Sequence, residues 1–85
     1  MDFLTYEEFH SDLHNARKVG VLKKTTNGYT VIETVYQNLY SGNLWVQVDT
    51  AYSDGTISTH YEEYGEDREI KAFAERFQQQ KECSE

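Results

Sequence analysis

Residues 25–40 read TTNGYTVIETVYQNLY and contain the strongest hairpin signal in the chain. Asn27 and Gly28 favour a two-residue turn of type I′, because that turn needs a positive φ at both central positions and these residues tolerate it. Valine, isoleucine, threonine and tyrosine, which strands favour, dominate the residues that follow. We therefore expect a hairpin whose two strands cover about residues 21–25 and 29–40.

Two further turn signals divide the chain beyond this hairpin, SGN at residues 41–43 and SDGT at residues 53–56. They predict strands over about residues 44–52 and 56–64. The short connections favour antiparallel pairing, since parallel strands need long crossovers. The strand over 29–40 is apolar on both faces, so either both faces are covered or a bulge near Glu33 or Asn38 shifts its register.

Helical signals flank the four predicted strands. Thr5 and Glu8 form a capping box that starts a helix over about residues 6–19, and Gly20 is expected to end it. Apolar residues at helical spacing predict a second helix over about residues 68–81, with Asp67 as its N-cap. Residues 78–85 have no apolar face and are expected to fray.

The predicted order of elements is therefore α-β-β-β-β-α. The chain has 85 residues, a length that favours a single domain over residues 1–85. We expect an α+β fold in which two helices pack on one face of a four-stranded antiparallel meander.

The alternation in residues 44–52 predicts which sheet face stays open. Leu44, Val46 and Val48 form the apolar face that the helices need, which turns Trp45 and its same-face neighbours outward. An exposed tryptophan among tyrosine and carboxylate side chains has the composition of a binding hot spot. The residues expected to share this outer face are Trp45, Gln47, Asp49, His60, Glu62, Tyr36 and Tyr40. The alternative is that Trp45 is the core residue and Val46 faces outward.

The formal net charge of the chain is −7. Such a charge disfavours direct binding to nucleic acid or to anionic membranes and favours basic protein surfaces as partners, unless it serves only for solubility. No apolar run reaches the length of a membrane span, and the start MDFL lacks the basic residues of a signal peptide. The single cysteine, Cys83, fits a reducing compartment, so we expect a cytoplasmic protein.

The acidic side chains are densest between residues 62 and 69. Three interpretations apply: a solvated strand end that also complements a helix dipole, a catalytic carboxylate pair, or an acidic face that binds a protein. Carboxylates repeating at about 6.6–6.8 Å along a strand suit a lysine- and arginine-lined groove that otherwise holds nucleic acid. The acidic residues are Glu62, Glu63, Glu66, Asp67 and Glu69.

His10 and His14 stand four residues apart on the first predicted helix, a spacing found in zinc sites. A third ligand would have to come from His60, Asp12 or a distant carboxylate, and the glutamate of the zinc-protease motif is absent. The alternative is that both histidines are polar residues at the edge of a buried stripe. The chain also lacks the glycine motifs that hold phosphates or dinucleotides, so no cofactor is expected.

In size, charge and composition the chain resembles the small acidic inhibitors encoded by phages and mobile elements, anti-CRISPR and anti-restriction proteins among them. This resemblance implies a cytoplasmic nucleic-acid mimic, not an enzyme, that binds the basic surface of a nucleic-acid-binding protein. One alternative is a homodimer or larger homo-oligomer that packs through its free sheet face. A second is a metal-binding or hydrolytic site on His10 and His14.

Overall fold

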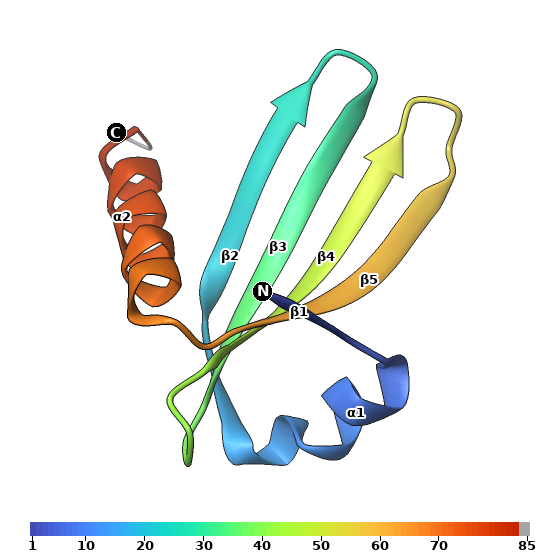
Figure 1. Ribbon diagram of the computed structural model, residues 1–85. Helices are drawn as coiled ribbons and strands as arrows, with labels where there is room; N and C mark the ends of the chain where they lie inside the picture. The colour runs from blue at the N-terminus through green and yellow to red at the C-terminus, as the bar shows by residue number, and fades with distance from the viewer. Residues whose placement is uncertain (84–85) are drawn as a thin grey trace.

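The computed structural model describes the backbone of residues 1–83 and the side chains of residues 1–80. It has an α+β fold with one antiparallel sheet of five strands in the order β1-β5-β4-β3-β2 (Figure 1). The predicted fold class is confirmed, with one strand more than expected. The elements are β1 (Asp2–Leu4), α1 (Tyr6–Ser11), a 3-10 turn (Leu13–Asn15), β2 (Ala16–Thr26), β3 (Tyr29–Asn38), β4 (Leu44–Tyr52), β5 (Ile57–Tyr64) and α2 (Asp67–Cys83).

The unpredicted strand is β1, which pairs antiparallel with the end of β5. Asp2 lies opposite Glu63, and Leu4 lies opposite Tyr61. Three residues are too few for alternation to reveal a strand. The capping box then turns the chain into α1: Glu8 N–H donates to Thr5 Oγ1 at 3.1 Å, and Thr5 N–H donates to Glu8 Oε1 at 3.0 Å.

The first helix is shorter than predicted, because α1 ends at Ser11 and residues from Ala16 onward belong to β2. Asn15 Nδ2 donates to Asp12 Oδ1 at 2.8 Å in the 3-10 turn between them. Pairing with β3 then recovers the backbone hydrogen bonds that a longer helix would have made. Gly20 therefore does not end a helix. It lies in β2, where a Cβ atom would approach the Phe77 ring to 2.8 Å.

The predicted turn at Asn27-Gly28 is confirmed, since Thr26 and Tyr29 are paired across it. Of the two central residues of this turn, only Gly28 has a positive φ, of 96°, so the expected type I′ geometry is wrong at Asn27. β3 ends at Asn38, and Tyr40 lies in the following turn. The apolar character of both faces of β3 has the first of its two predicted causes along the end of the strand near Asn38, where α2 covers Val35 and Phe9 of α1 covers Tyr36. The bulge lies in β2, between Lys18 and Gly20.

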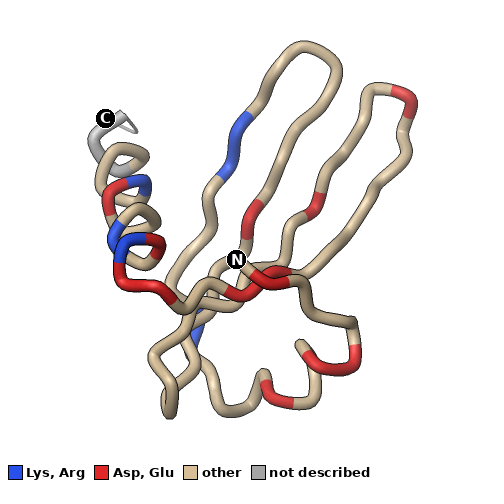
Figure 2. Tube along the Cα trace, viewed as in Figure 1, with Lys and Arg blue, Asp and Glu red and all other residues tan. Residues whose placement is uncertain are grey.

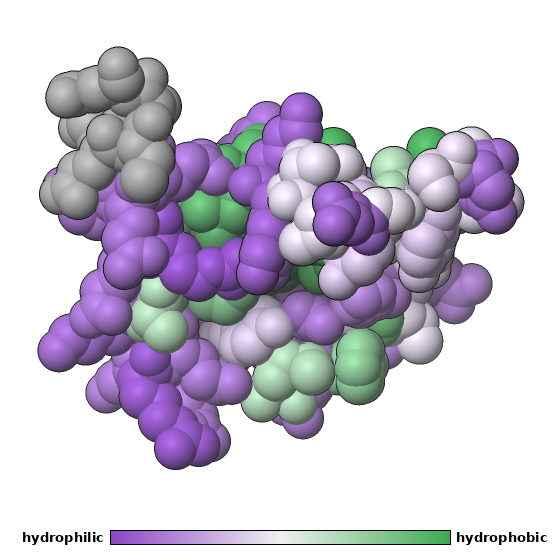
Figure 3. Space-filling view, turned by 90° about the horizontal axis from the view of Figure 1, so that it is seen from above, coloured by the Kyte–Doolittle hydropathy of each residue, from purple (hydrophilic) through white to green (hydrophobic). Residues whose placement is uncertain are grey.

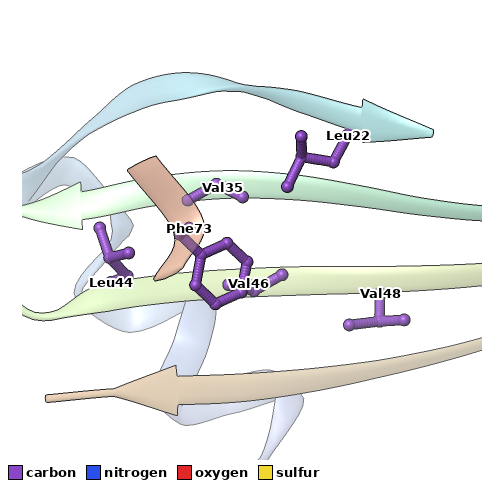
Figure 4. Packing of buried hydrophobic residues seen from close by; sticks show 6 residues of the cluster. All are labelled: Leu22, Val35, Leu44, Val46, Val48 and Phe73. Atoms are coloured by element: carbon purple, nitrogen blue, oxygen red, sulfur yellow. The ribbon is translucent and has the colours of Figure 1, made fainter. Parts of the chain in front are cut away.

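The two helices pack on opposite faces of the sheet, which corrects the prediction that they share one. Phe73 of α2 lies over Val35 and Val46 in the main hydrophobic cluster, together with Leu22, Leu44 and Val48 (Figure 4). Phe9 of α1 is fully buried and contacts the rings of Tyr36, Trp45 and Tyr61. Trp45 and Val46 are neighbours in one strand, so they point to opposite faces. We call these faces the α1 face and the α2 face.

The second helix begins at Asp67, one residue before the predicted start, so Asp67 is its first residue and not its N-cap. The predicted fraying is wrong for Gln80, whose Nε2 donates to the Val21 carbonyl at 2.8 Å. The rest of the predicted tail includes Ser84 and Glu85, which lie outside the described residues. Within residues 1–83, no helix has both the length and the apolar character needed to cross a membrane.

Candidate functional site

Trp45 is buried, with 8% of its surface exposed, so the predicted exposed hot spot is wrong. Phe9 packs on it from α1, and its Nε1–H donates to Glu63 Oε2 at 2.9 Å. The alternative that Val46 faces outward is also wrong, because Val46 is fully buried under α2. Both predictions assumed that helices cover one face only.

The acidic run does not form one continuous face. Glu62 and Glu63 are adjacent strand residues, so their carboxylates lie on opposite faces of the sheet. On the α2 face, Tyr64 Oη–H donates to Glu62 Oε1 at 2.6 Å, and His60 Nε2 lies 2.8 Å from Glu62 Oε2. Burial, followed by the hydrogen bond to Glu62, raises the pKa of the Tyr64 hydroxyl far above its usual value.

The remaining members of the run mostly have partners at the start of α2. Glu66 Oε2 forms an ion pair with Arg68 Nε at 2.8 Å. Glu69 Oε2 lies 3.1 Å from the Met1 amine, and the hydrogen bond from that amine lowers the pKa of the Glu69 carboxyl. Asp67 is exposed in the first helical turn. Four of the five carboxylates therefore have partners within the protein, and two of these, Glu63 and Glu69, join separate parts of the fold.

The structure brings together only part of the predicted binding face. Tyr36 and Trp45 are register partners, and Asp49 follows four residues along β4 on the same α1 face. His60 is paired with Val48 and Glu62 with Val46, which places both on the α2 face. Tyr40 is in the turn after β3, with 84% of its surface exposed.

Asp49 is the distinctive group on the α1 face. It lies in the middle of β4, between Ile32 of β3 and Thr59 of β5. Thr59 Oγ1–H donates to Asp49 Oδ1 at 2.6 Å, and Gln47 Nε2–H donates to Asp49 Oδ2 at 3.1 Å. Both carboxylate oxygens are thus held in place. No ion pair in the described part of the chain involves Asp49, which is partly exposed.

On the α1 face, the sheet is covered by α1 on one side of Asp49 and is open to solvent on the other side. Towards α1 lies Tyr61, whose ring stacks on Phe9. The pKa of the Tyr61 hydroxyl is raised first by burial and then by the nearby Tyr6 and Asp49. Towards the hairpin tips, the row Thr30, Ala51 and Ile57 follows, and Ile57 is 69% exposed. Asp49 is therefore a fixed carboxylate at the border of the uncovered half of the α1 face.

The charges of the molecule are unevenly distributed along the sequence. No lysine or arginine occurs in residues 1–16 or 25–67, whereas eleven carboxylate side chains do: Asp2, Glu7, Glu8, Asp12, Glu33, Asp49, Asp54, Glu62, Glu63, Glu66 and Asp67. The lysines and arginines of the described residues lie on β2 and α2 (Figure 2). Viewed from above the hairpin tips, most of the surface is hydrophilic and hydrophobic residues appear as separate patches (Figure 3).

The two helix histidines do not form the predicted metal site. The His10 ring packs 4.2 Å from the Tyr6 ring and 5.3 Å from the Phe9 ring, measured between centroids, while His14 belongs to the 3-10 turn. Among the described residues, no group of three histidine, cysteine or carboxylate side chains could hold a metal ion. His10 is therefore an exposed residue that packs against the aromatic rings of α1 and β5.

Three of the surface cavities in the described part of the chain have neither a histidine nor a carboxylate in their lining. One of about 320 Å³ lies at the hairpin tips beside Tyr29 and Tyr52. One of about 300 Å³ lies between β2 and α2, and one of about 200 Å³ lies beside Ile70 and Phe77.

Comparisons with models of known protein families, with curated proteins and with solved structures found no match. The geometry around Asp49 is thus the main evidence on function.

Proposed function

We propose that this protein binds a basic surface of another protein through the uncovered half of its α1 face, centred on Asp49. The observation that carries the proposal is the Asp49 carboxylate, which two hydrogen bonds hold in place and which forms no ion pair within residues 1–80, even with Lys23 two strands away on the same face. Charged carboxylates in partly buried positions are usually paired. An incoming arginine or lysine side chain would supply the missing partner.

Pre-organisation supports this role for Asp49. Thr59 and Gln47 fix the carboxylate before a partner arrives, so less side-chain entropy is lost on binding. Each oxygen also keeps lone pairs that can accept hydrogen bonds from a guanidinium group, which binds carboxylates with two parallel bonds. Arginine is therefore the cation that fits this site best.

The uneven distribution of charges supports a basic partner as well. Residues 25–67, which include β3, β4 and β5, have seven carboxylates and no lysine or arginine. Such a field speeds up the approach of a basic surface and repels the phosphates of nucleic acid. Nucleic-acid-binding proteins carry basic surfaces of this kind. We propose that occupying such a surface excludes nucleic acid, so the protein acts as an inhibitor of its target.

The test begins with capture of the target from the native host and measurement of its affinity for purified variants. We expect Asp49→Asn to weaken binding about tenfold or more, because it removes the charge that pairs with the partner. Glu75→Gln is the matched control, since Glu75 is an exposed carboxylate on α2. Nucleic acid should compete with the protein for the target. An equal effect of the two variants, or a target without a basic surface, would contradict the proposal.

A further inference from the structure

The two edges of the sheet differ in how they are protected against pairing with another strand. Natural edge strands carry lysines, bulges or covering elements that block such pairing. β2 has all three: Lys18, Lys23 and Lys24, a register shift between Lys18 and Gly20, and the side chain of Gln80 from α2. Gln80 Oε1 accepts the N–H of Lys23 at 3.1 Å, and its Nε2 donates to the Val21 carbonyl at 2.8 Å.

The opposite edge has none of these devices along half of its length. β1 pairs only with residues 61–63 of β5, because the chain leaves the sheet at Thr5. Residues Ile57, Ser58 and Thr59 continue the edge, and all three are exposed. This stretch has no lysine and no bulge, and the chain has no proline. Ile57 is moreover a large apolar residue with 69% of its surface exposed.

The register identifies which backbone groups this edge presents. The contacts of Gln80 show that Val21 and Lys23 direct their N–H and C=O groups away from β3. In an antiparallel sheet, bonded and non-bonded pairs alternate along each strand and across successive strands. Lys23 is aligned with Ile32, Asp49 and Thr59, so the backbone groups of Thr59 point away from β4. By the same alternation, those of Ile57 point outward too.

We propose that Ile57 and Thr59 form a docking edge for an extended basic segment of the partner, which adds a strand to β5 in line with β1. This inference rests on the proposed function and names the mode of recognition. The added strand would bond the outward N–H and C=O groups of Ile57 and Thr59, as in other cases of strand addition. An apolar partner residue would cover Ile57.

The position of Asp49 supports a basic segment as the occupant. Thr59 separates Asp49 from the edge, so a partner residue opposite Thr59 would lie about 10 Å from Asp49, two strand spacings away. A lysine or arginine side chain extends across such a span. A second copy of this chain fits less well. The pairing would join two acidic regions.

The probe is a six-residue peptide with blocked ends. Threonine occupies every second position, and the positions between are lysine, valine and lysine, in that order. Its acidic counterpart has glutamate in place of lysine. In titrations followed by NMR, we expect the basic peptide to shift the amide signals of Ile57 and Thr59 and to slow their hydrogen exchange about tenfold or more. The acidic peptide should do neither. Equal effects of the two peptides, or shifts confined to other residues, would overturn the proposal.

Two edge variants localise the binding. Ile57→Pro removes an outward N–H that has no partner in the sheet, and an edge strand tolerates proline there. We expect it to weaken peptide binding about tenfold, whereas Val21→Pro on the opposite edge should leave it unchanged. Binding that Asp49→Asn weakens and Ile57→Pro does not would overturn the docking edge and leave the proposed function standing. Peptide binding that neither Asp49→Asn nor Ile57→Pro weakens would contradict both the docking edge and the proposed function. A dimer that Ile57→Pro dissociates would assign the edge to a second copy and overturn the basic segment.

Discussion

Trp45 shows how strongly one side chain depends on the element that covers it. The alternation of Trp45 with Val46 correctly places the two residues on opposite faces. The helix predicted over residues 6–19 is longer than α1, however, so the sequence does not show where Phe9 packs. The indole also has a polar partner, since Glu63 accepts its N–H. A buried tryptophan with a satisfied N–H is a structural residue in the first place.

We therefore predict that Trp45→Ala lowers the free energy of unfolding by about 3–5 kcal/mol, because it opens a cavity beneath Phe9 and leaves Asn43 as the remaining side-chain donor to Glu63 Oε2. Urea denaturation measures the change. The emission of Trp45, the single tryptophan, should be blue-shifted and protected from quenchers. A loss below about 1 kcal/mol, or the emission of an exposed indole, would show that α1 does not cover this face.

Asp54, in the turn between β4 and β5, makes a pH-dependent contribution to the stability of the folded protein. Its carboxylate accepts hydrogen bonds from the hydroxyl and the N–H of Thr56, which lower its pKa below the ordinary 3.8. A lowered folded-state pKa means stability that is present above about pH 3.8 and is lost as the pH falls through the lower folded value. Asp54→Asn keeps an acceptor for the N–H and removes the titration. The stability difference between wild type and this variant should shrink in acid, and a constant difference would contradict the assignment.

At the scale of elements, the β4–β5 turn explains why the predicted binding face was half wrong. A four-residue loop at 53–56 would pair Tyr52 with Ile57 and place His60 opposite Asp49, on the same face as Trp45. In the structure, Tyr52 N–H bonds the Thr56 carbonyl, and Ala51 is paired with Ile57. Gly55 adopts a φ of 91°, as three-residue hairpin loops require at their last position. A slip of one residue moves every side chain of β5 to the other face.

Gly20 tests the packing of α2 on β2. A Cβ atom at this position would lie 2.8 Å from a ring carbon of Phe77. Gly20→Ala should therefore cost about 1–3 kcal/mol, because the ring and the helix behind it must shift. Phe77→Leu removes the blocking ring edge, so the double variant should lose less stability than the sum of the two single variants. Strict additivity in urea denaturation would show that the two residues do not touch.

At the scale of the whole molecule, hairpins, turn glycines and the stripe of α2 follow from local signals, because alternation and helical spacing act over a few residues. The placement of α1 on the second face does not. It depends on β1 pairing with β5 and on the 3-10 turn that leads into β2, and neither has a periodic pattern. The paired state of Asp49 with Thr59 likewise depends on the three-residue loop between their strands.

The central claim is that the partner lies against the uncovered half of the α1 face. Site-specific photo-crosslinking to the captured target tests it most directly, with the crosslinker placed in turn at Ala51, two residues beyond Asp49 on the same face, and at Glu75, on the exposed side of α2. We predict crosslinks from position 51 to a lysine- and arginine-rich surface of the target and none from position 75. Crosslinks from position 75 alone would contradict the claim.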